Sequence, residues 1–263
     1  MIRFLPEDAA ALLDLSASVG WTHSLEDWQT ALAAGIIFGH RDGARIQSSA
    51  AIYKYGSELA SIGQVIVRAE ARRQGLARAL MLRCLAQAPA QPIMLVATPA
   101  GQPLYESLGF RIVEPTFRLI SEGPISLPQP VDCRPMTAAD LSLAFTLDAI
   151  AYGADRSHLL RERWKQSGHA AILTDGSGFA CATPHGLGPI IAASAAGAAQ
   201  LIAFLAVRQR VVVDVPERQA EFLRLLTQAG LRFIGTRPLM LLNASELPGK
   251  RESVFALASL AYG

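Results

Sequence analysis

The chain has 263 residues, of which 51% are hydrophobic and 17% charged, so it can fill one large core or two smaller ones and does not have a disordered composition. Its net charge of +2 gives no reason to expect a nucleic acid or an anionic membrane as partner, and its five histidines lack the spacing of metal ligands. The three cysteines are far apart and odd in number, which favours reduced thiols and a cytoplasmic location over a disulfide framework.

Two segments bear on membrane association. The sequence begins MIRFLPEDAA, which contains no uninterrupted apolar signal segment. Residues 186–207 carry no charge and are long enough to span a bilayer, but a proline, two polar residues and several small residues interrupt them. We therefore expect a strand at 189–192 followed by a helix from about Ala195 to Val207, and no membrane association.

The first elements alternate between helices and antiparallel strands. Ser24 with Asp27 is similar to a capping box and predicts the start of a helix. Asp42-Gly43 is a strong hairpin signal. The predicted elements of this part are a strand at 2–4, a helix from 6 to 20, a helix at 25–34, and strands at 36–40 and 45–53.

The stretch from 61 to 85 predicts a buried strand, a charged turn and a helix. Val65, Ile66 and Val67 end the β-branched strand, and a helix with an apolar face begins at Gly75. The first turn of a helix leaves backbone N–H groups without partners, and the helix dipole adds positive potential there. The turn therefore suits a bound diphosphate, although a glycine that only eases a tight bend explains the same residues.

A second block follows a short strand predicted at 93–97. Residues 102–108 predict a short helix that carries Tyr105 and ends at Gly109, and strands are expected at 110–113 and 116–120. Residues 121–130 hold three prolines and a glycine, which is typical of a linker between domains.

These two blocks carry a resemblance to a known family. Arg72-x-x-Gly75-x-Ala77, directly after the strand, resembles the acetyl-CoA signature of the GNAT acyltransferase superfamily. Residues 104–110, LYESLGF, resemble the terminal helix and turn of that family, where a tyrosine sits near the sulfur of CoA. The resemblance covers residues 1–120 well and the remainder weakly. It implies an α+β fold with a mostly antiparallel mixed sheet flanked by helices, and acetyl-CoA as cosubstrate without a metal.

The resemblance also implies site residues. Tyr105 would be the general acid, the alternative being a buried aromatic with a structural hydroxyl bond. The wall of the acceptor site would include Trp21, His23 and Asp27, unless they only pack. The general base stays unassigned: Gln64 cannot take a proton, and His23, Asp27 and Glu58 remain candidates. The implied contacts to the cofactor come from Val65, Ile66, Val67, Arg72, Arg73, Gln74, Gly75, Leu76, Ala77, Arg78 and Thr98.

The second half repeats the order of elements. Residues 133–141 echo residues 2–10, and a strand at 211–215, a helix around 222–226 and Gly230–Phe233 mirror the end of the first half. After the strand at 189–192, however, no arginine accompanies the helix start, and Leu225 stands where a tyrosine would be. We expect residues 1–120 to form a GNAT domain, 121–130 a linker and 131–263 a degenerate GNAT-like domain, with one active site in the first.

The leading hypothesis is an N-acetyltransferase that moves an acetyl group from acetyl-CoA to a primary amine of a small molecule by direct attack in a ternary complex. One alternative is a CoA-binding sensor or interaction module without turnover, and another is a protein or peptide N-acetyltransferase. A homodimer is an option that the sequence leaves open.

Overall fold

The computed structural model describes residues 1–206 and 210–263. The first half contains β1 (Ile2–Arg3), α1 (Ala9–Ala17), α2 (Leu25–Ala34), β2 (Ile36–Asp42), β3 (Arg45–Tyr55), β4 (Leu59–Val67), α3 (Leu76–Leu85), β5 (Ile93–Val96), α4 (Gln102–Ser107) and β6 (Arg111–Ile120). The second half contains β7 (Cys133–Pro135), α5 (Leu141–Tyr152), α6 (Ser157–Gln166), β8 (His169–Leu173), β9 (Gly178–Thr183), β10 (Gly186–Ala192), α7 (Ala195–Leu205), β11 (Val212–Pro216), α8 (Ala220–Gln228), β12 (Arg232–Leu242) and β13 (Val254–Ala256).

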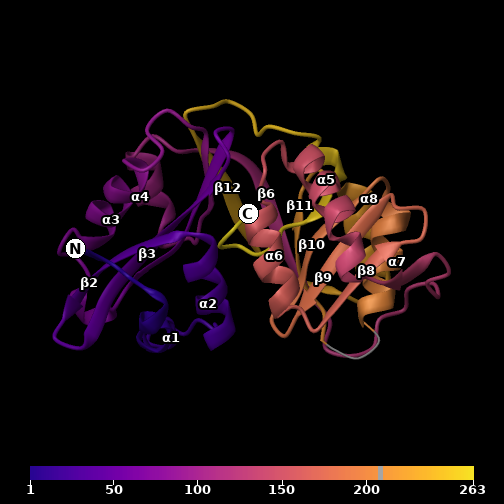
Figure 1. The fold of residues 1–263 in the computed structure, drawn as a ribbon, viewed down its shortest axis with the longest axis horizontal. Coiled ribbons are helices and arrows are strands. Elements are labelled where there is room, and N and C mark those ends of the chain that lie inside the picture. Colours follow the sequence, from indigo (N-terminus) through magenta and orange to yellow (C-terminus); the bar gives the residue numbers. More distant parts are fainter. Residues whose placement is uncertain (207–209) are drawn as a thin grey trace.

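Within the described residues, all thirteen strands belong to one sheet. Its order is β1-β2-β3-β4-β5-β12-β6-β11-β10-β9-β8-β7, with β13 paired to β10. Most neighbouring pairs are antiparallel, and the parallel ones are β4 with β5 and β10 with β11. Helices flank the sheet on both faces (Figure 1). The predicted α+β fold with a mostly antiparallel sheet is therefore confirmed.

The two halves exchange a strand at the centre of this sheet. β12 of the second half lies between β5 and β6 of the first, with Leu239 opposite Val96 and Thr236 opposite Phe117. β6 in turn pairs with β11, where Leu119 lies opposite Val213. Because each half supplies a strand that borders the other, the halves are joined by a continuous hydrogen-bond ladder, while residues 121–130 contain no helix or strand.

The prediction of two short closing strands at 110–113 and 116–120 is wrong. β6 is a single strand that runs through Glu114 and Pro115. Pro115 lies opposite Pro238 of β12, so the two missing N–H donors fall at the same point of the ladder. A proline in β6 therefore does not end the strand.

One hydrophobic core is shared by both halves. It joins Trp28 of α2 and Tyr53 of β3 to Tyr152 of α5, Leu159 of α6 and Tyr262 near the C-terminus. Figure 1 shows α2 and α6 side by side at the centre of the molecule, and these two helices are in contact. Separate cores lie under α3 and under α7 with α8. The shared core fixes the position of the second half against the first.

The long uncharged segment folds as part of the sheet and a helix. Residues 186–207 contribute β10, then Ser194 as the N-cap of α7, whose last helical residue is Leu205. Val207, the predicted end of the helix, lies outside the described residues. None of the helices in residues 1–206 and 210–263 has the length and hydrophobicity needed to cross a membrane.

Candidate functional site

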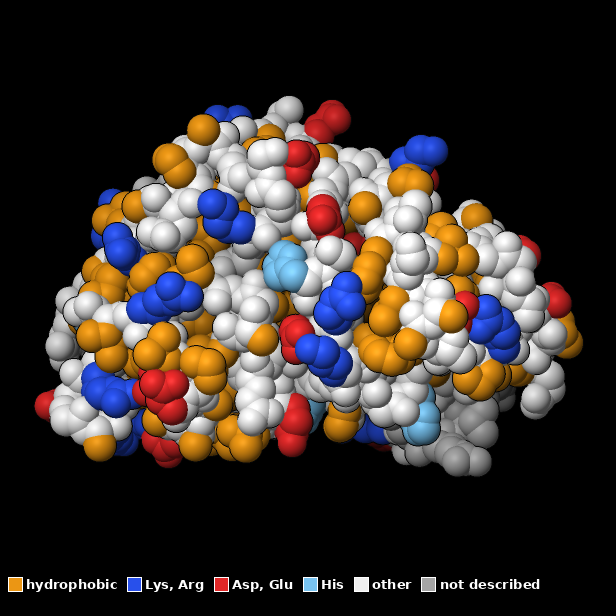
Figure 2. Space-filling view, in the orientation of Figure 1, with side chains coloured by type: hydrophobic (Ala, Val, Ile, Leu, Met, Phe, Trp, Pro, Cys, Tyr) orange, Lys and Arg blue, Asp and Glu red, His pale blue; other side chains and the backbone are white. Residues whose placement is uncertain are grey.

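A central cavity of about 370 Å³ lies between the two halves. Its first-half wall includes the loop from Gly20 to His23, Asp27, the end of β5 and Tyr105, and its second-half wall includes Arg163, His185 and residues 257–262. Figure 2 shows acidic and basic side chains interspersed over the viewed face around the boundary of the halves. The cavity is within the size range of small-molecule sites.

The cavity is bordered by two parallel strands that separate. β4 and β5 pair only at Ala60 with Ile93 and at Ser61 with Met94, although β4 continues to Val67. Beyond these pairs, the backbone edges of the two strands no longer face each other in register. Val65 of β4 and Val96 of β5 line the cavity at this opening. Backbone N–H and C=O groups there are therefore free to bind an extended ligand arm.

A bulge in β4 sits at the same opening. Gln64 has a φ of +46°, which is rare for a residue with a side chain, and the register with β3 shifts between Ser49 and Ala51. The Gln64 carbonyl accepts a hydrogen bond from the Ser49 hydroxyl at 2.8 Å, and its side-chain oxygen accepts one from the Tyr53 hydroxyl. Gln64 is therefore tied into the protein, and its amide has no role as a proton acceptor.

The loop after β4 presents an uncapped helix N-terminus. Gly75 is the N-cap of α3 with a φ of +78°, and no side chain caps the first turn. A Cβ at this position would meet nothing within 4 Å, so the space above the helix start is open. The helix proper begins at Leu76, one residue later than predicted. Its first amides and the helix dipole favour an anion here.

Three arginines surround this helix start. Arg72, Arg73 and Arg78 are exposed, as is Gln74, whereas Leu76 and Ala77 are half-buried. Arg72 Nε donates to the Val67 carbonyl at 3.2 Å, and Arg78 donates to the Ser107 hydroxyl at 3.2 Å. These bonds orient two of the guanidinium groups while leaving most of their N–H donors open. A diphosphate fits the chemistry of this cradle.

Tyr105 of α4 lines the cavity, and its ring is packed against Phe110. Only 7% of the residue is exposed, and this burial raises the pKa of its hydroxyl to about 12. The hydroxyl makes no hydrogen bond to any part of the chain that the structure describes. Tyr105 therefore carries a proton at neutral pH and has no structural bond that occupies it.

The turn before α4 positions this tyrosine. A Cβ on Gly101 would lie 2.9 Å from the Tyr105 hydroxyl oxygen and 2.8 Å from the ring, so the ring folds back over a residue that must be small. Thr98 lines the cavity, but its hydroxyl accepts a hydrogen bond from the Gly101 N–H at 3.3 Å. Thr98 thus shapes this turn, and a contact from its hydroxyl to a cofactor stays a prediction.

The predicted acceptor-side residues come together at the boundary of the halves. Trp21, His23 and Asp27 all line the cavity, whereas Trp28 is fully buried and donates from Nε1 to the Ser16 hydroxyl at 3.1 Å. The His23 ring lies between the two tryptophan rings, with centroid distances of 5.6 and 5.4 Å. Burial lowers the pKa of His23. Glu58 does not reach this region, because it lies in the exposed turn before β4 and accepts from Ser57.

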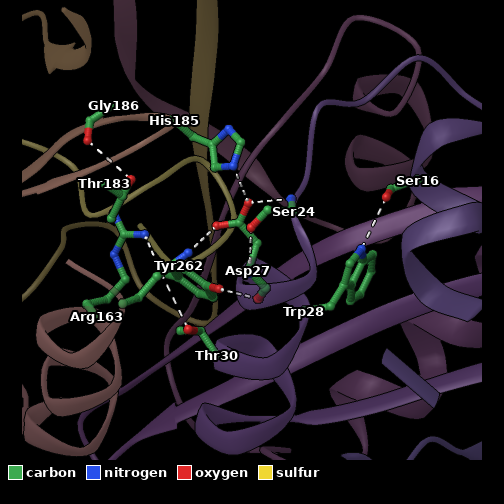
Figure 3. Close-up of polar contacts among 11 residues, drawn as sticks. Ser16, Ser24, Asp27, Trp28, Thr30, Arg163, Thr183, His185, Gly186 and Tyr262 are labelled. Carbon is green, nitrogen blue, oxygen red and sulfur yellow. Dashed lines mark hydrogen bonds and ion pairs between the residues drawn. The ribbon is translucent and has the colours of Figure 1, made fainter. Parts of the chain in front are cut away.

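Several cavity residues from the second half had no sequence signal. His185 lies in the turn between β9 and β10, with Nε2 3.2 Å from Asp27 Oδ2 (Figure 3). Arg163 of α6 donates to the carbonyls of Gly188 and Ala258 at 3.1 and 2.8 Å. Neither residue belongs to a motif, and α6, β8 and β9 were not predicted. Their place at the site follows only from the packing of one half on the other.

The C-terminal segment, residues 257–263, crosses β4. The Tyr262 carbonyl accepts from the Tyr55 hydroxyl at 2.8 Å, and the Tyr262 ring meets Tyr53 edge-on at 4.9 Å. A Cβ on Gly63 would lie 2.2 Å from the Ala261 carbonyl oxygen, so this segment rests directly on the β4 backbone. Tyr262, which no motif places, is thus part of the cavity wall.

The corresponding region of the second half is closed. β10 and β11 pair at Leu187 with Val213, but β13 then occupies the space between them. Ile190 of β10 lies opposite Ala256, and the Leu257 N–H donates to the Asp214 carbonyl of β11 at 3.0 Å. The slot that is open between β4 and β5 is therefore filled by the protein's own backbone between β10 and β11.

Comparisons with known proteins agree with this architecture. Models of the acetyltransferase (GNAT) domain match residues 21–119 and residues 144–256. A relative from Bacillus subtilis, "Uncharacterized N-acetyltransferase YitH", is 29% identical over 100% of this chain and 98% of its own length.

Solved structures show the same fold across both halves. A "putative acetyltransferase" from Pyrococcus horikoshii has a TM-score of 0.85 at 17% identity and covers 100% of this chain and 95% of its own. A tandem GNAT protein from the clavulanic acid biosynthesis pathway has a TM-score of 0.64 at 15% identity, with 92% and 97% covered. The chain is therefore a member of the GNAT N-acetyltransferase family, with two GNAT domains in tandem.

Proposed function

We propose that this acyltransferase moves an acetyl group from acetyl-CoA to the primary amine of a small molecule by direct attack in a ternary complex. The observation that carries the proposal is the opening between β4 and β5, which has Tyr105 on one side and leads through the end of β4 to the uncapped start of α3. Among the residues that the structure describes, this arrangement occurs once, because β13 fills the matching space in the second half.

The residues of the first half are suited to hold acetyl-CoA. The amides of the first turn of α3, with Arg72, Arg73 and Arg78 around them, would bind the diphosphate. The backbone of Val65, Ile66 and Val67, beyond the point where β4 leaves β5, would bind the pantetheine arm. The bound cosubstrate would supply an acyl group activated as a thioester.

Tyr105 is suited to deliver a proton to the leaving sulfur. Burial raises the pKa of its hydroxyl to about 12, so the group is protonated at neutral pH. No hydrogen bond within the described part of the chain competes for it. We therefore assign Tyr105 the role of general acid.

The size of the cavity favours a small acceptor. Its volume is about 370 Å³, and Trp21, His23 and Asp27 face residues of the second half across it. A peptide or a protein surface would need an open groove, whereas residues of the second half line this side of the cavity. The three free cysteines fit the cytoplasmic location that we propose with this function.

Calorimetry and a thiol assay test the proposal. Acetyl-CoA is titrated into the wild type and into Gly75→Glu, which places a carboxylate in the diphosphate cradle; we expect binding to the wild type only. CoA release is then followed with phenethylamine, spermidine, lysine and kanamycin as acceptors. Equal binding to both proteins, or none to the wild type, would overturn the proposal. Tight binding without turnover of any amine would favour a CoA-binding module instead.

A further inference from the structure

A histidine and an aspartate meet across the boundary of the two halves. His185 belongs to the turn between β9 and β10 of the second half, and Asp27 to the first turn of α2 of the first half. His185 Nε2 lies 3.2 Å from Asp27 Oδ2, and both side chains line the cavity that also contains Tyr105. Figure 3 shows the other ring nitrogen of His185 pointing away from the carboxylate.

The Asp27 carboxylate is fixed by groups from both halves. Its Oδ2 accepts from the Ser24 backbone N–H at 2.8 Å as part of the capping box of α2. Its Oδ1 accepts from Gln166 Nε2 of α6 at 2.6 Å. With His185 as a third partner, both oxygens are engaged and only 13% of the side chain is exposed. Asp27 is therefore placed to orient a neighbour and is poorly placed to take a proton from a ligand.

The contact with Asp27 favours one tautomer of His185. A carboxylate oxygen 3.2 Å from Nε2 stabilises a proton on that nitrogen, and Nδ1 is then an acceptor with a free lone pair. Nδ1 makes no hydrogen bond to any described residue, and the side chain of His185, which lines the cavity, is 37% exposed. His185 Nδ1 is thus the proton acceptor, the Asp27 carboxylate orients the imidazole, and Ser24 and Gln166 hold that carboxylate in place.

We infer that His185 is the general base of the reaction, with Asp27 as its positioning residue; the inference rests on the function proposed above. Nδ1 takes a proton from the acceptor nitrogen while the C–N bond forms and the C–S bond breaks. Tyr105 gives its proton to the departing sulfur, and solvent then returns a proton from His185 to Tyr105. The base comes from the second half and the acid from the first, so neither half is sufficient alone.

The other titratable groups near His185 are less suited to this role. His23 is held between two tryptophans, and burial lowers its pKa, but it makes no hydrogen bond to any described residue that would orient it. Glu26 is exposed and does not line the cavity. From the second half, Arg163 and Tyr262 face the same region: the first is a cation, and burial raises the pKa of the second. His23 is therefore the matched control.

The decisive experiment is a pH profile of kcat/KM, measured as CoA release with acetyl-CoA and the fastest amine of the panel. We expect His185→Gln to lower kcat/KM about 100-fold or more at neutral pH and to remove the acidic limb of the profile. The rate of this variant should recover as the free amine loses its own proton at high pH. His23→Gln should keep the acidic limb. A profile of His185→Gln that matches the wild type would overturn the inference.

Two further measurements separate this inference from the proposed function. Acetyl-CoA titrations should give the same affinity for the wild type and His185→Gln; absence of binding to the wild type would overturn both ideas, whereas turnover with an unchanged His185→Gln profile would overturn only this one. A ¹⁵N–¹H correlation spectrum of the histidine rings needs no substrate. It should show His185 with its proton on Nε2, and a proton on Nδ1 would contradict the assignment.

Discussion

The two halves contain the same strand–turn–helix unit, but the N-caps of the two helices differ. In the first half, the N-cap of α3 is Gly75, in a left-handed conformation without a side chain over the helix start. In the second half, the N-cap of α7 is Ser194, whose hydroxyl accepts from the Gly197 N–H at 3.2 Å. The backbone amide three residues after the N-cap is therefore free of a side-chain cap in α3, whereas in α7 the protein itself satisfies it.

The strands that lead to these helices show the same contrast. β4 and β5 separate and leave an opening, whereas β13 enters between β10 and β11. The second half thus lacks both features that we propose for the cofactor site, the open anion cradle and the slot for an extended arm. What it supplies is a wall for the site of the first half, through β12, His185 and residues 257–263. One copy of a duplicated fold acts as structural support for the other.

The largest expected effect is on Tyr105, which has no hydroxyl counterpart in α8, where Leu226 occupies the matching place four residues before Gly230. Tyr105→Phe removes the proton donor, so kcat should fall by about 100-fold or more while the affinity for acetyl-CoA stays unchanged. Steady-state kinetics and calorimetry measure the two quantities. Tyr152→Phe is the matched control, since its hydroxyl contacts the Met94 sulfur in the shared core and does not line the cavity. Equal losses in the two variants would remove the role of Tyr105.

The raised pKa of Tyr105 predicts the pH at which its hydroxyl ionises. An ordinary tyrosine ionises near pH 10, and burial raises the pKa of Tyr105 to about 12. Because the folded state holds this proton more tightly than the unfolded chain, Tyr105 stays protonated at pH 10, and this group lowers the stability of the fold as the pH rises from about 10 to about 12. The tyrosinate absorbance of the wild type minus that of Tyr105→Phe should therefore remain flat at pH 10. A step at about pH 10 would show an exposed phenol.

A pair of alanines compares the two helix starts directly. Ala77 and Ala196 occupy the same position, two residues after the N-cap, in α3 and α7. Ala77→Glu places a carboxylate beside the proposed diphosphate and should weaken acetyl-CoA binding by about 100-fold, since opposed like charges cost several kcal/mol. Ala196→Glu makes the same chemical change at an exposed site of the second half. It should leave the affinity unchanged, and a loss of affinity in this variant would mean that α7 also meets the ligand.

A smaller effect on kcat is expected when a side chain is added at Gly101, in the turn before α4. In Gly101→Ala the added Cβ would lie 2.8 Å from the Tyr105 ring, so the ring and its hydroxyl must move. A displaced proton donor should lower kcat by about tenfold, with little change in the affinity for acetyl-CoA. Gly123→Ala in the linker is the control, because no described residue lies within 4 Å of its Cβ. A kcat for Gly101→Ala equal to that of the control would contradict the positioning role.

Local chemistry explains which parts of the fold the sequence predicted. The capping box of Ser24 and Asp27 predicted α2 to the residue, and Asp42-Gly43 predicted the hairpin of β2 and β3. The strand, turn and helix around Gly75 were predicted because each signal lies within a few residues of the next. Such elements are specified by neighbours in the chain, which a single sequence displays.

The parts that were missed depend on contacts between distant residues. The exchange of β6 and β12 is a matter of pairing between strands about 120 residues apart, and no local pattern distinguishes it from a simple hairpin. Likewise, the pairing of Asp27 with His185 joins a helix cap to an unpredicted turn of the other half. Asp27 was chosen as an acceptor-side residue from the family resemblance, and its partner could be found only once the halves were packed together.

The smallest expected effect comes from removing the N-cap of α7, which is compared with removing the N-cap of α2. Ser194→Ala removes the cap of α7 and should lower the free energy of unfolding by about 1 kcal/mol. It should not change acetyl-CoA affinity or kcat, because β13 keeps the second slot filled even when the amide of Gly197 is released. Ser24→Ala removes a comparable cap from α2: the Ser24 hydroxyl accepts from the Asp27 backbone N–H at 3.2 Å, so its loss loosens the turn that carries Asp27, although the Ser24 N–H still donates to the Asp27 carboxylate. Loss of this cap should lower kcat as well as stability, so denaturation curves and turnover together distinguish a cap that serves only the fold from one that also orients the site.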